Sequence, residues 1–136
     1  MAEPRVPAYV EVSNFTVKET FDAKYKSSLP KLMMEAATKT IESKLKRIAT
    51  TKKPSDKTSP AIFLSGSLAL KQITDGFSTD LSMPFGKLDL AKNTKSMKGA
   101  MSASVDAQNA TVEQVIRDMV SETLVDDLED AINKSA

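Results

Sequence analysis

The sequence predicts a small α+β domain in which two amphipathic helices cover one face of a mostly antiparallel, four-stranded sheet. Two segments carry apolar residues at helical spacing, four segments have the composition or alternation of strands, and an Asp-Gly pair marks a hairpin. A length of 136 residues is typical of one domain. We therefore expect residues 9–136 to form a single domain and residues 1–8, which contain two prolines, to form a flexible lead-in.

The first strand is expected over residues 9–17, where β-branched and aromatic residues predominate. The alternation of apolar residues changes parity between Val12 and Phe15. One extra residue near Ser13 and Asn14 would account for that change, because a bulge reverses the facing of the residues that follow it. The sequence therefore predicts a β-bulge at this point.

The following helix is expected over residues 28–48. Ser28 is a suitable N-cap, and Pro30 would then lie in the first turn, where its missing N–H has no helical partner to lose. The apolar residues of this segment fall on one stripe of the helix. They are Leu29, Leu32, Met33, Ala36, Ala37, Ile41, Leu45 and Ile48.

Three further strands are expected over residues 61–73, 77–85 and 97–105. The first two are joined at Asp75 and Gly76, a pair that is typical of two-residue hairpin turns. Apolar and polar residues alternate in these strands, so one sheet face should meet the helices and the other should meet water. On the last strand, the core-facing residues are expected to be Met97, Gly99, Met101, Ala103 and Val105.

A second helix is expected to begin at Thr111, which gives the element order β-α-β-β-β-α. The spacing of its apolar residues again draws a single stripe. That stripe consists of Val112, Val115, Ile116, Met119, Val120, Leu124, Leu128, Ala131 and Ile132.

The chain contains neither cysteine nor histidine. Disulfides, thiolate metal sites and a cysteine nucleophile are therefore excluded, and the commonest general base is missing. No Gly-x-Ser-x-Gly turn presents a serine nucleophile, and no spacing brings two carboxylates together. We expect a protein that is not an enzyme, with no cofactor, no metal site and no evident small-molecule substrate.

Opposite charges are concentrated in two parts of the chain. Residues 24–57 carry ten basic side chains against three acidic ones, whereas residues 105–136 carry eight acidic side chains against two basic ones. A basic stretch extends over Lys44–Lys57, and its second half lies in a polar loop at 50–60. This stretch is suited to bind phosphate groups of nucleic acid or an anionic membrane. It contains no aromatic residue for base stacking, and a solvated surface is the alternative interpretation. Its candidate binding residues are Lys44, Lys46, Arg47, Lys52 and Lys53.

The acidic side chains Asp126, Asp127 and Asp130 lie close together in the second helix. Carboxylate oxygens can coordinate a hard cation, but the alternating spacing and central glycine of a calcium loop are missing here. These three residues are therefore candidates for binding a charged partner, with a solvated helix face as the alternative. Met34, just off the stripe of the first helix, is a candidate for an adaptable hydrophobic contact, although most of the seven methionines match core positions.

The element order resembles that of the amino-terminal domain of TolB and related bacterial envelope lipoproteins, such as the curli-secretion and penicillin-binding-protein-activator lipoproteins. The resemblance rests on the segments Ile62–Leu68, which contains a Gly-Ser step after the first helix, and Met97–Val105, a strand of small residues before the last helix. It implies a protein-binding or assembly role without catalytic residues. It also implies a periplasmic or envelope location if a leader was removed; otherwise the protein is expected in the cytoplasm.

We therefore expect a non-catalytic protein-interaction or assembly module, as part of a bacterial cell-envelope complex. The opposed charges of the two helices favour self-association, head to tail, or docking to a charged protein partner. Two alternatives come from other classes: a basic-patch binder of nucleic acid or anionic membrane through Lys44–Lys57, and a hydrolase that uses carboxylates or a serine–lysine pair. Salt-sensitive affinity for polyanions would favour the first alternative, and a deep pocket with converging charged residues would favour the second.

Overall fold

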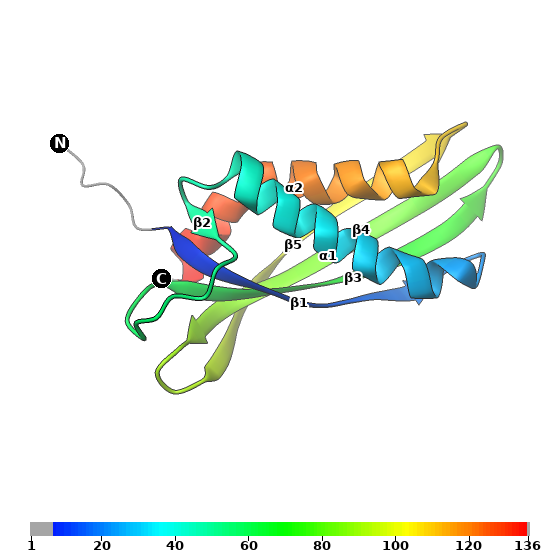
Figure 1. Cartoon of the computed structure of the whole chain (residues 1–136). Coiled ribbons are helices and arrows are strands. Elements are labelled where there is room, and N and C mark those ends of the chain that lie inside the picture. The colour runs from blue at the N-terminus through cyan, green and yellow to red at the C-terminus, as the bar shows by residue number, and fades with distance from the viewer. Residues whose placement is uncertain (1–6, 136) are drawn as a thin grey trace.

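The computed structural model describes residues 7–135, and these form an α+β fold with both helices on the same side of a twisted sheet (Figure 1). The element order is β1 (Ala8–Glu19), α1 (Lys24–Lys44), β2 (Ala49–Thr50), β3 (Ala61–Ile73), β4 (Gly76–Asp89), β5 (Thr94–Gln108) and α2 (Val112–Ser135). Residues 1–6 of the predicted lead-in lie outside the described part. Ala8, the last residue of that prediction, already belongs to β1, because its N–H donates to the carbonyl of Ile48 at 2.9 Å.

The sheet is mixed and five-stranded, which corrects the prediction of four mostly antiparallel strands. Its strand order is β2-β1-β3-β4-β5. The strands β3, β4 and β5 form the expected antiparallel meander, but β1 pairs in parallel with β3 and with β2. The parallel pairing is possible because α1 carries the chain back across the sheet between β1 and β3. The predicted bulge is confirmed: the register of β1 on β3 shifts between Val12 and Phe15.

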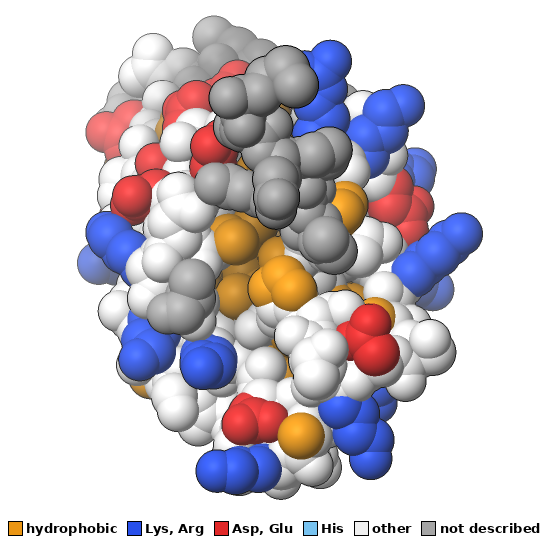
Figure 2. Space-filling view, turned by 90° about the vertical axis from the view of Figure 1, so that its left-hand side faces the viewer, with side chains coloured by type: hydrophobic (Ala, Val, Ile, Leu, Met, Phe, Trp, Pro, Cys, Tyr) orange, Lys and Arg blue, Asp and Glu red, His pale blue; other side chains and the backbone are white. Residues whose placement is uncertain are grey.

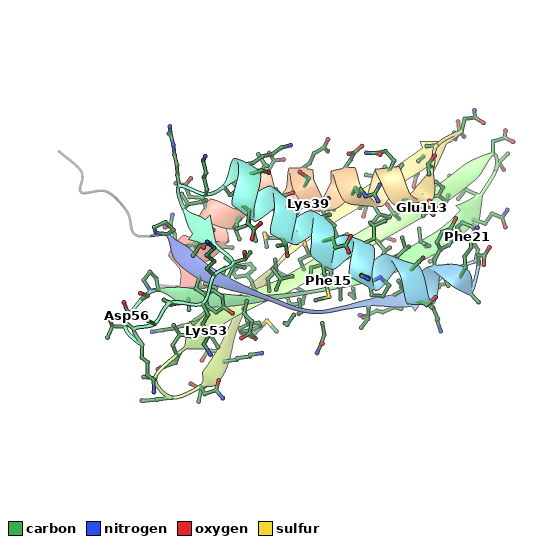
Figure 3. The ribbon with its side chains drawn as sticks, in the orientation of Figure 1. Phe15, Phe21, Lys39, Lys53, Asp56 and Glu113 are labelled. Atoms are coloured by element: carbon green, nitrogen blue, oxygen red, sulfur yellow. The ribbon has the colours of Figure 1, made fainter. Side chains whose placement is uncertain are left out.

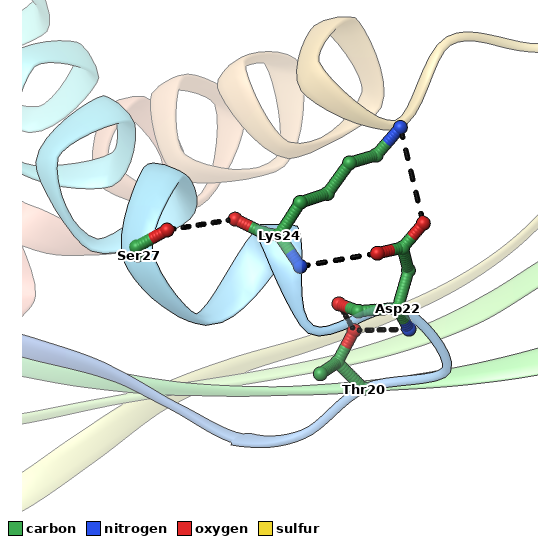
Figure 4. Close-up of polar contacts among 4 residues, drawn as sticks. All are labelled: Thr20, Asp22, Lys24 and Ser27. Carbon is green, nitrogen blue, oxygen red and sulfur yellow. Dashed lines mark hydrogen bonds and ion pairs between the residues drawn. The ribbon is translucent and has the colours of Figure 1, made fainter.

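Helix α1 begins four residues earlier than predicted, because a turn before it supplies hydrogen bonds that the sequence pattern did not reveal (Figure 4). The Oδ1 of Asp22 accepts the N–H of Lys24 at 3.0 Å, and the Oγ1 of Thr20 accepts the N–H of Asp22 at 3.2 Å. Ser28 is therefore an exposed residue of the helix and not its N-cap. Pro30 consequently lies inside the helix, where the carbonyl four residues before it lacks its usual helical donor.

Helix α1 also ends earlier than predicted, at Lys44. The carbonyl of Leu45 accepts the N–H groups of Ile48 and Ala49, so the chain turns back towards the sheet. Leu45 and Ile48 still pack against the core, as their positions in the apolar pattern indicated, but from the turn and not from the helix. The turn leads into β2, which occupies the beginning of the segment that was predicted to be a loop.

The core lies between the sheet and the two helices, and β3, β4 and both helices contribute the apolar faces that their sequences predicted, whereas Met97 and Val105 of β5 are exposed. On β3 and β4 the expected residues are buried, with Leu64 and Met83 completely inaccessible. The largest side chains of the core are Val10, Leu29, Met33, Ile41, Ile62, Leu64, Leu68, Leu70, Met83, Ile116, Leu124 and Leu128. Helices α1 and α2 also pack against each other and run in the same direction (Figure 1). No helix within residues 7–135 combines the length and the apolar character needed to cross a membrane.

The opposite face of the sheet is more polar but has a small buried cluster of its own. Phe63 alternates with the core residues of β3 and is nevertheless only 7% exposed. The Nζ of Lys95 lies 5.7 Å from the centre of the Phe63 ring and 3.0 Å from Oε1 of Glu11, so this ion pair covers the ring. Gly86 makes room for the ring, because a Cβ at this position would lie 2.7 Å from the Cε1 of Phe63.

Candidate functional site

The predicted basic residues are all exposed and gather at one end of the molecule. Lys44 ends α1, Lys46 and Arg47 lie in the turn after it, and Lys52 and Lys53 follow β2. Figure 3 shows Lys53 and Asp56 at this end, far from Phe21 at the start of α1. Within residues 7–135 the structure gives none of these five basic side chains an ion pair, so their charges face solvent. A role in binding stays a prediction.

Part of the loop after β2 is ordered around one carboxylate. The Oδ1 of Asp56 accepts the N–H of Thr58 at 3.2 Å, the N–H of Ser59 at 2.8 Å and the hydroxyl of Ser59 at 2.6 Å. These hydrogen bonds, led by the one from the Ser59 side chain, hold the pKa of Asp56 below its ordinary value. This turn gives the second half of the predicted polar loop a defined shape.

The three acidic candidates are exposed on α2, but the structure separates them. Asp127 and Asp130 line a hollow of about 400 Å³ against the outer edge of β5, together with Lys98 and Lys134. Asp130 is paired there with Lys134, whose Nζ lies 3.0 Å from Oδ2 of Asp130. Asp126 does not belong to this hollow. Both signs of charge therefore occur along the β5 edge, and the surface is not purely acidic as the sequence suggested.

Met34 is half-buried and packs against the hydrophobic core. Its thioether is therefore partly used within the fold, and only the remaining part is accessible to a partner. A role for Met34 in partner binding stays a prediction. The large apolar side chains that the structure does leave exposed are Phe21, Met97, Val105 and Val125.

A hollow lies at the basic end, between the start of β1, the loop after β2, the turn after β4 and the last turn of α2. We call it the end hollow. Its volume is about 490 Å³, and its apolar lining comes from Ala8, Ala61, Ile62, Leu88, Leu90 and Ile132. Figure 2 looks onto this end and shows hydrophobic side chains at the bottom of a depression, with basic and acidic side chains around it.

Polar groups at the end hollow come from three separate segments. Lys57, Lys87 and Asp89 contribute charges, and Ser135 contributes a hydroxyl. Asp89 is already engaged, since its Oδ1 accepts the N–H groups of Ala91 and Lys92 at 3.0 Å each. The N–H of Lys92 is the main reason that the pKa of Asp89 is held below its ordinary value. The hydroxyl of Ser135 is buried, and no residue in the described part of the chain forms a hydrogen bond with it.

No group of three or more acidic side chains that is able to hold a metal ion occurs within residues 7–135. Of the carboxylates at the two hollows, Asp89 accepts N–H groups in a turn and Asp130 pairs with Lys134. What the geometry offers is an apolar hollow with a basic rim, and an open strand edge that carries both signs of charge.

Sequence reasoning missed Lys87, Leu88 and Ser135 as candidate residues, and it did not single out Lys98. A hollow that draws on four segments has no signal in the local pattern of any one of them. The exposed lysine that precedes a buried leucine at 87–88 was the available clue. The sequence pattern alone could not use this clue, because it did not show that β4 extends to Asp89.

No protein-family model matches the sequence, and the comparison with curated proteins found no match. Solved structures do share the fold. A hypothetical protein of Chlamydia trachomatis superposes with a TM-score of 0.63 at 10% identity, over 93% of this chain and 98% of the other. The PelC dodecamer of Paraburkholderia phytofirmans gives a TM-score of 0.57 at 11% identity, over 92% and 93%. Protein XCC0632 of Xanthomonas campestris gives 0.52 at 5% identity, over 96% and 87%. At these identities the likeness shows the fold alone, and the resemblance to the TolB group stays a prediction.

Proposed function

We propose that this protein is a non-catalytic assembly module that associates with a second copy of itself along the open edge of β5. The observation that carries the proposal is the length of that edge. Strand β5 has 15 residues, and within residues 7–135 no strand pairs with its outer side. An edge of this length presents a row of unpaired N–H and C=O groups that can accept another strand.

Two copies of β5 can pair in antiparallel orientation with complementary residues opposite one another. If two copies meet with Ser102 on the twofold axis, Ala100 lies opposite Ser104 and Gly99 opposite Val105. Lys98 then lies opposite Asp106, and symmetry provides this pair twice. Val105, 36% exposed in one copy, would be covered in the dimer. Lys98 and Asp106 are exposed and have no ion pair within residues 7–135, so both are available.

A bulge limits how far this pairing extends. Phe85 of β4 pairs with Gly99, whereas the next residue, Gly86, pairs with Met97, so Lys98 is an extra residue on β5. Bulges and lysines on an edge restrict indiscriminate strand addition. The small residues between Gly99 and Ser104 are therefore the part of the edge best suited to close pairing, and the Lys98–Asp106 pair would set its register.

The solved structures that share this fold support self-association, but they do not define which surfaces meet. The PelC structures that share this fold are dodecamers. We extend self-association to this chain as part of the proposal, and we place the protein in the bacterial cell envelope because of the resemblance to envelope lipoproteins. Cell fractionation would test the location separately from the assembly.

Size-exclusion chromatography with light scattering, at low and high salt, tests the assembly. Wild type is expected to form a dimer or a higher species that weakens with added salt, because the exposed charge pairs are screened. Lys98→Glu and Asp106→Lys should each shift the equilibrium towards monomer, and the double variant should restore association. Lys26→Glu, an exposed change on α1, is the control. A wild-type monomer at every concentration would overturn the proposal, and an oligomer insensitive to all these changes would place the interface elsewhere.

A second candidate function is supported by the basic end. Lys44, Lys46, Arg47, Lys52 and Lys53 are exposed, close to one another along the chain and free of ion pairs within the described part. Such a cluster is suited to a polyanion, whether nucleic acid or anionic membrane. Binding of labelled RNA, and of vesicles that contain phosphatidylglycerol, should fall steeply with salt and be lost in Lys52→Glu/Lys53→Glu. Affinity that is absent at low salt would eliminate this candidate.

A further inference from the structure

We propose that the end hollow binds one amphipathic anion with a single acyl chain, the chain lying among the apolar side chains and the anionic head at the basic rim. The inference goes beyond self-association, because the hollow and the β5 edge are built from different residues. It depends on three independent features of the hollow: its apolar lining, an unsatisfied buried hydroxyl and unpaired ammonium groups.

The apolar part of the hollow has the size of a ligand site. A volume of about 490 Å³ lies within the range of roughly 300–1,000 Å³ that is usual for small-molecule pockets. Ile62, Leu88 and Ile132 bring branched side chains to it from two strands and from α2. A saturated chain matches such a lining, because it needs no hydrogen bonds and is stabilised by the removal of apolar surface from water.

The hydroxyl of Ser135 indicates where a polar head belongs. Ser135 is 2% exposed and lines the hollow, yet its Oγ has no hydrogen-bond partner among residues 7–135. A buried hydroxyl that lacks a hydrogen-bond partner is energetically unfavourable. An oxygen acceptor on a bound ligand would remove that cost, so the site is suited to an oxygen-bearing head and not to a hydrocarbon alone.

The charge at the rim selects an anion. Lys57 and Lys87 both line the hollow, and neither has an ion pair within residues 7–135. The one acidic side chain in the lining, Asp89, is already held by the N–H groups of Ala91 and Lys92. The rim is therefore net positive, with two ammonium groups against the one carboxylate of Asp89, which is attracted to Lys87.

The last turn of α2 opposes an anion, because carbonyl groups at a helix C-terminus carry partial negative charge. Lys134 in this turn offsets part of that field, although its Nζ is shared with Asp130. Binding should consequently depend on the charges of Lys57 and Lys87. An uncharged chain of the same length should bind more weakly than the anion.

Calorimetric titration of the full chain with dodecanoate, and with dodecanol as the uncharged probe, tests the proposal. One dodecanoate per chain is expected, with weaker binding of dodecanol. Leu90→Trp, which fills the hollow from a half-buried turn position, should lower the affinity for dodecanoate roughly tenfold or more. Lys57→Gln/Lys87→Gln should lower it about tenfold and remove the preference for dodecanoate over dodecanol. Lys26→Gln, which removes an exposed charge from α1, is the matched control.

Methyl NMR keeps the test decisive if a variant is poorly folded. In the wild-type protein, dodecanoate should shift the methyl signals of Ile62, Leu88 and Ile132, while Val125 on the exposed side of α2 stays unchanged. Vesicles that contain phosphatidylglycerol form a second arm, which distinguishes a membrane lipid from a free acyl anion as the source of the chain. No dodecanoate binding, dodecanoate binding that Leu90→Trp leaves unchanged, or dodecanoate binding without shifts of these methyl groups would each overturn the proposal.

Discussion

The two faces of the sheet are built by different means. The face under the helices is covered by two long elements and buries a continuous set of Leu, Ile, Val, Met and Phe side chains. The other face has no helix over it, and it buries Phe63 beneath an ion pair between Lys95 and Glu11. The covered face is stabilised by the area removed from water, and the open face by a few local contacts. Substitutions on the two faces should therefore differ in cost.

The largest effect is expected on the covered face. Leu64→Ala should lower the free energy of unfolding by about 2–5 kcal/mol, because the deleted methyl groups leave a cavity among residues that cannot collapse into it. Leu64 is completely inaccessible. Urea denaturation followed by circular dichroism measures the difference. A loss as small as that for an exposed position would show that the covered face is not the main source of stability.

Gly86→Ala tests how closely the backbone and the Phe63 ring pack on the open face. A Cβ on Gly86 would clash with the carbonyl oxygen of Ser96 and would lie 2.7 Å from the Phe63 ring. The strands must move apart, so we expect a loss of roughly 1–3 kcal/mol. Gly99→Ala is the control, since its Cβ would first meet the Phe85 ring, at 3.1 Å. Equal losses for the two variants would show that the approach of Ser96 to Gly86 is not a constraint.

Thr79→Val tests a polar contact within the covered face. The hydroxyl of Thr79 is fully buried, donates to the carbonyl of Val105 at 3.1 Å and lies 2.9 Å from Sδ of Met119. Valine keeps the shape and removes the hydrogen bond, so a loss of about 1 kcal/mol is expected. Thermal unfolding by calorimetry provides the measurement, with Thr79→Ser as the variant that retains the hydroxyl. A stabilised Thr79→Val would mean that the contact does not contribute.

The smallest effect is expected for the ion pair on the open face. Its side chains are 48% and 35% exposed, so the pair is largely screened by water. Lys95→Met keeps the aliphatic cover over Phe63 and should change the free energy of unfolding by less than about 1 kcal/mol. A double-mutant cycle with Glu11→Gln isolates the coupling between the two charges. A coupling well above this bound would assign the ion pair a structural role comparable to core packing.

The sequence predicted side-chain facing better than strand neighbours. The apolar alternation of β3 and β4 and the bulge after Val12 all correspond to the structure, because these features are local. The predicted hairpin forms, but its turn lies one residue earlier than predicted: Ile73 pairs with Gly76, so Thr74 and Asp75 form the turn, and Asp75 has a φ of 60°. Parallel pairing of β1 with β3 was not predicted, since periodicity does not specify which strands are adjacent. The helix between them was the available signal, because a parallel pair needs a crossover connection.

Two local predictions failed for reasons that lie outside the local pattern. Met97 was expected on the core side of β5, but the extra residue at Lys98 reverses its facing, and Met97 is 64% exposed. The start of α1 was placed at Ser28, because the hydrogen bond from Lys24 to Asp22 precedes the apolar stripe. Among the candidate site residues, the exposure of the lysines and aspartates could be predicted. The end hollow could not, because the side chains that line it meet only in the folded chain.

The order of strand pairing has a consequence for the folding pathway. The pairs β3–β4 and β4–β5 join neighbours along the chain and require only short loops to close. Tyr9, by contrast, must find Ala61 after the whole of α1 and the loop that follows. Since contacts between distant residues are entropically more expensive to form first, the meander is expected to organise the transition state, and β1 is expected to join it late. During that interval both outer strands of the meander are exposed, and premature encounters between chains are most probable at that stage.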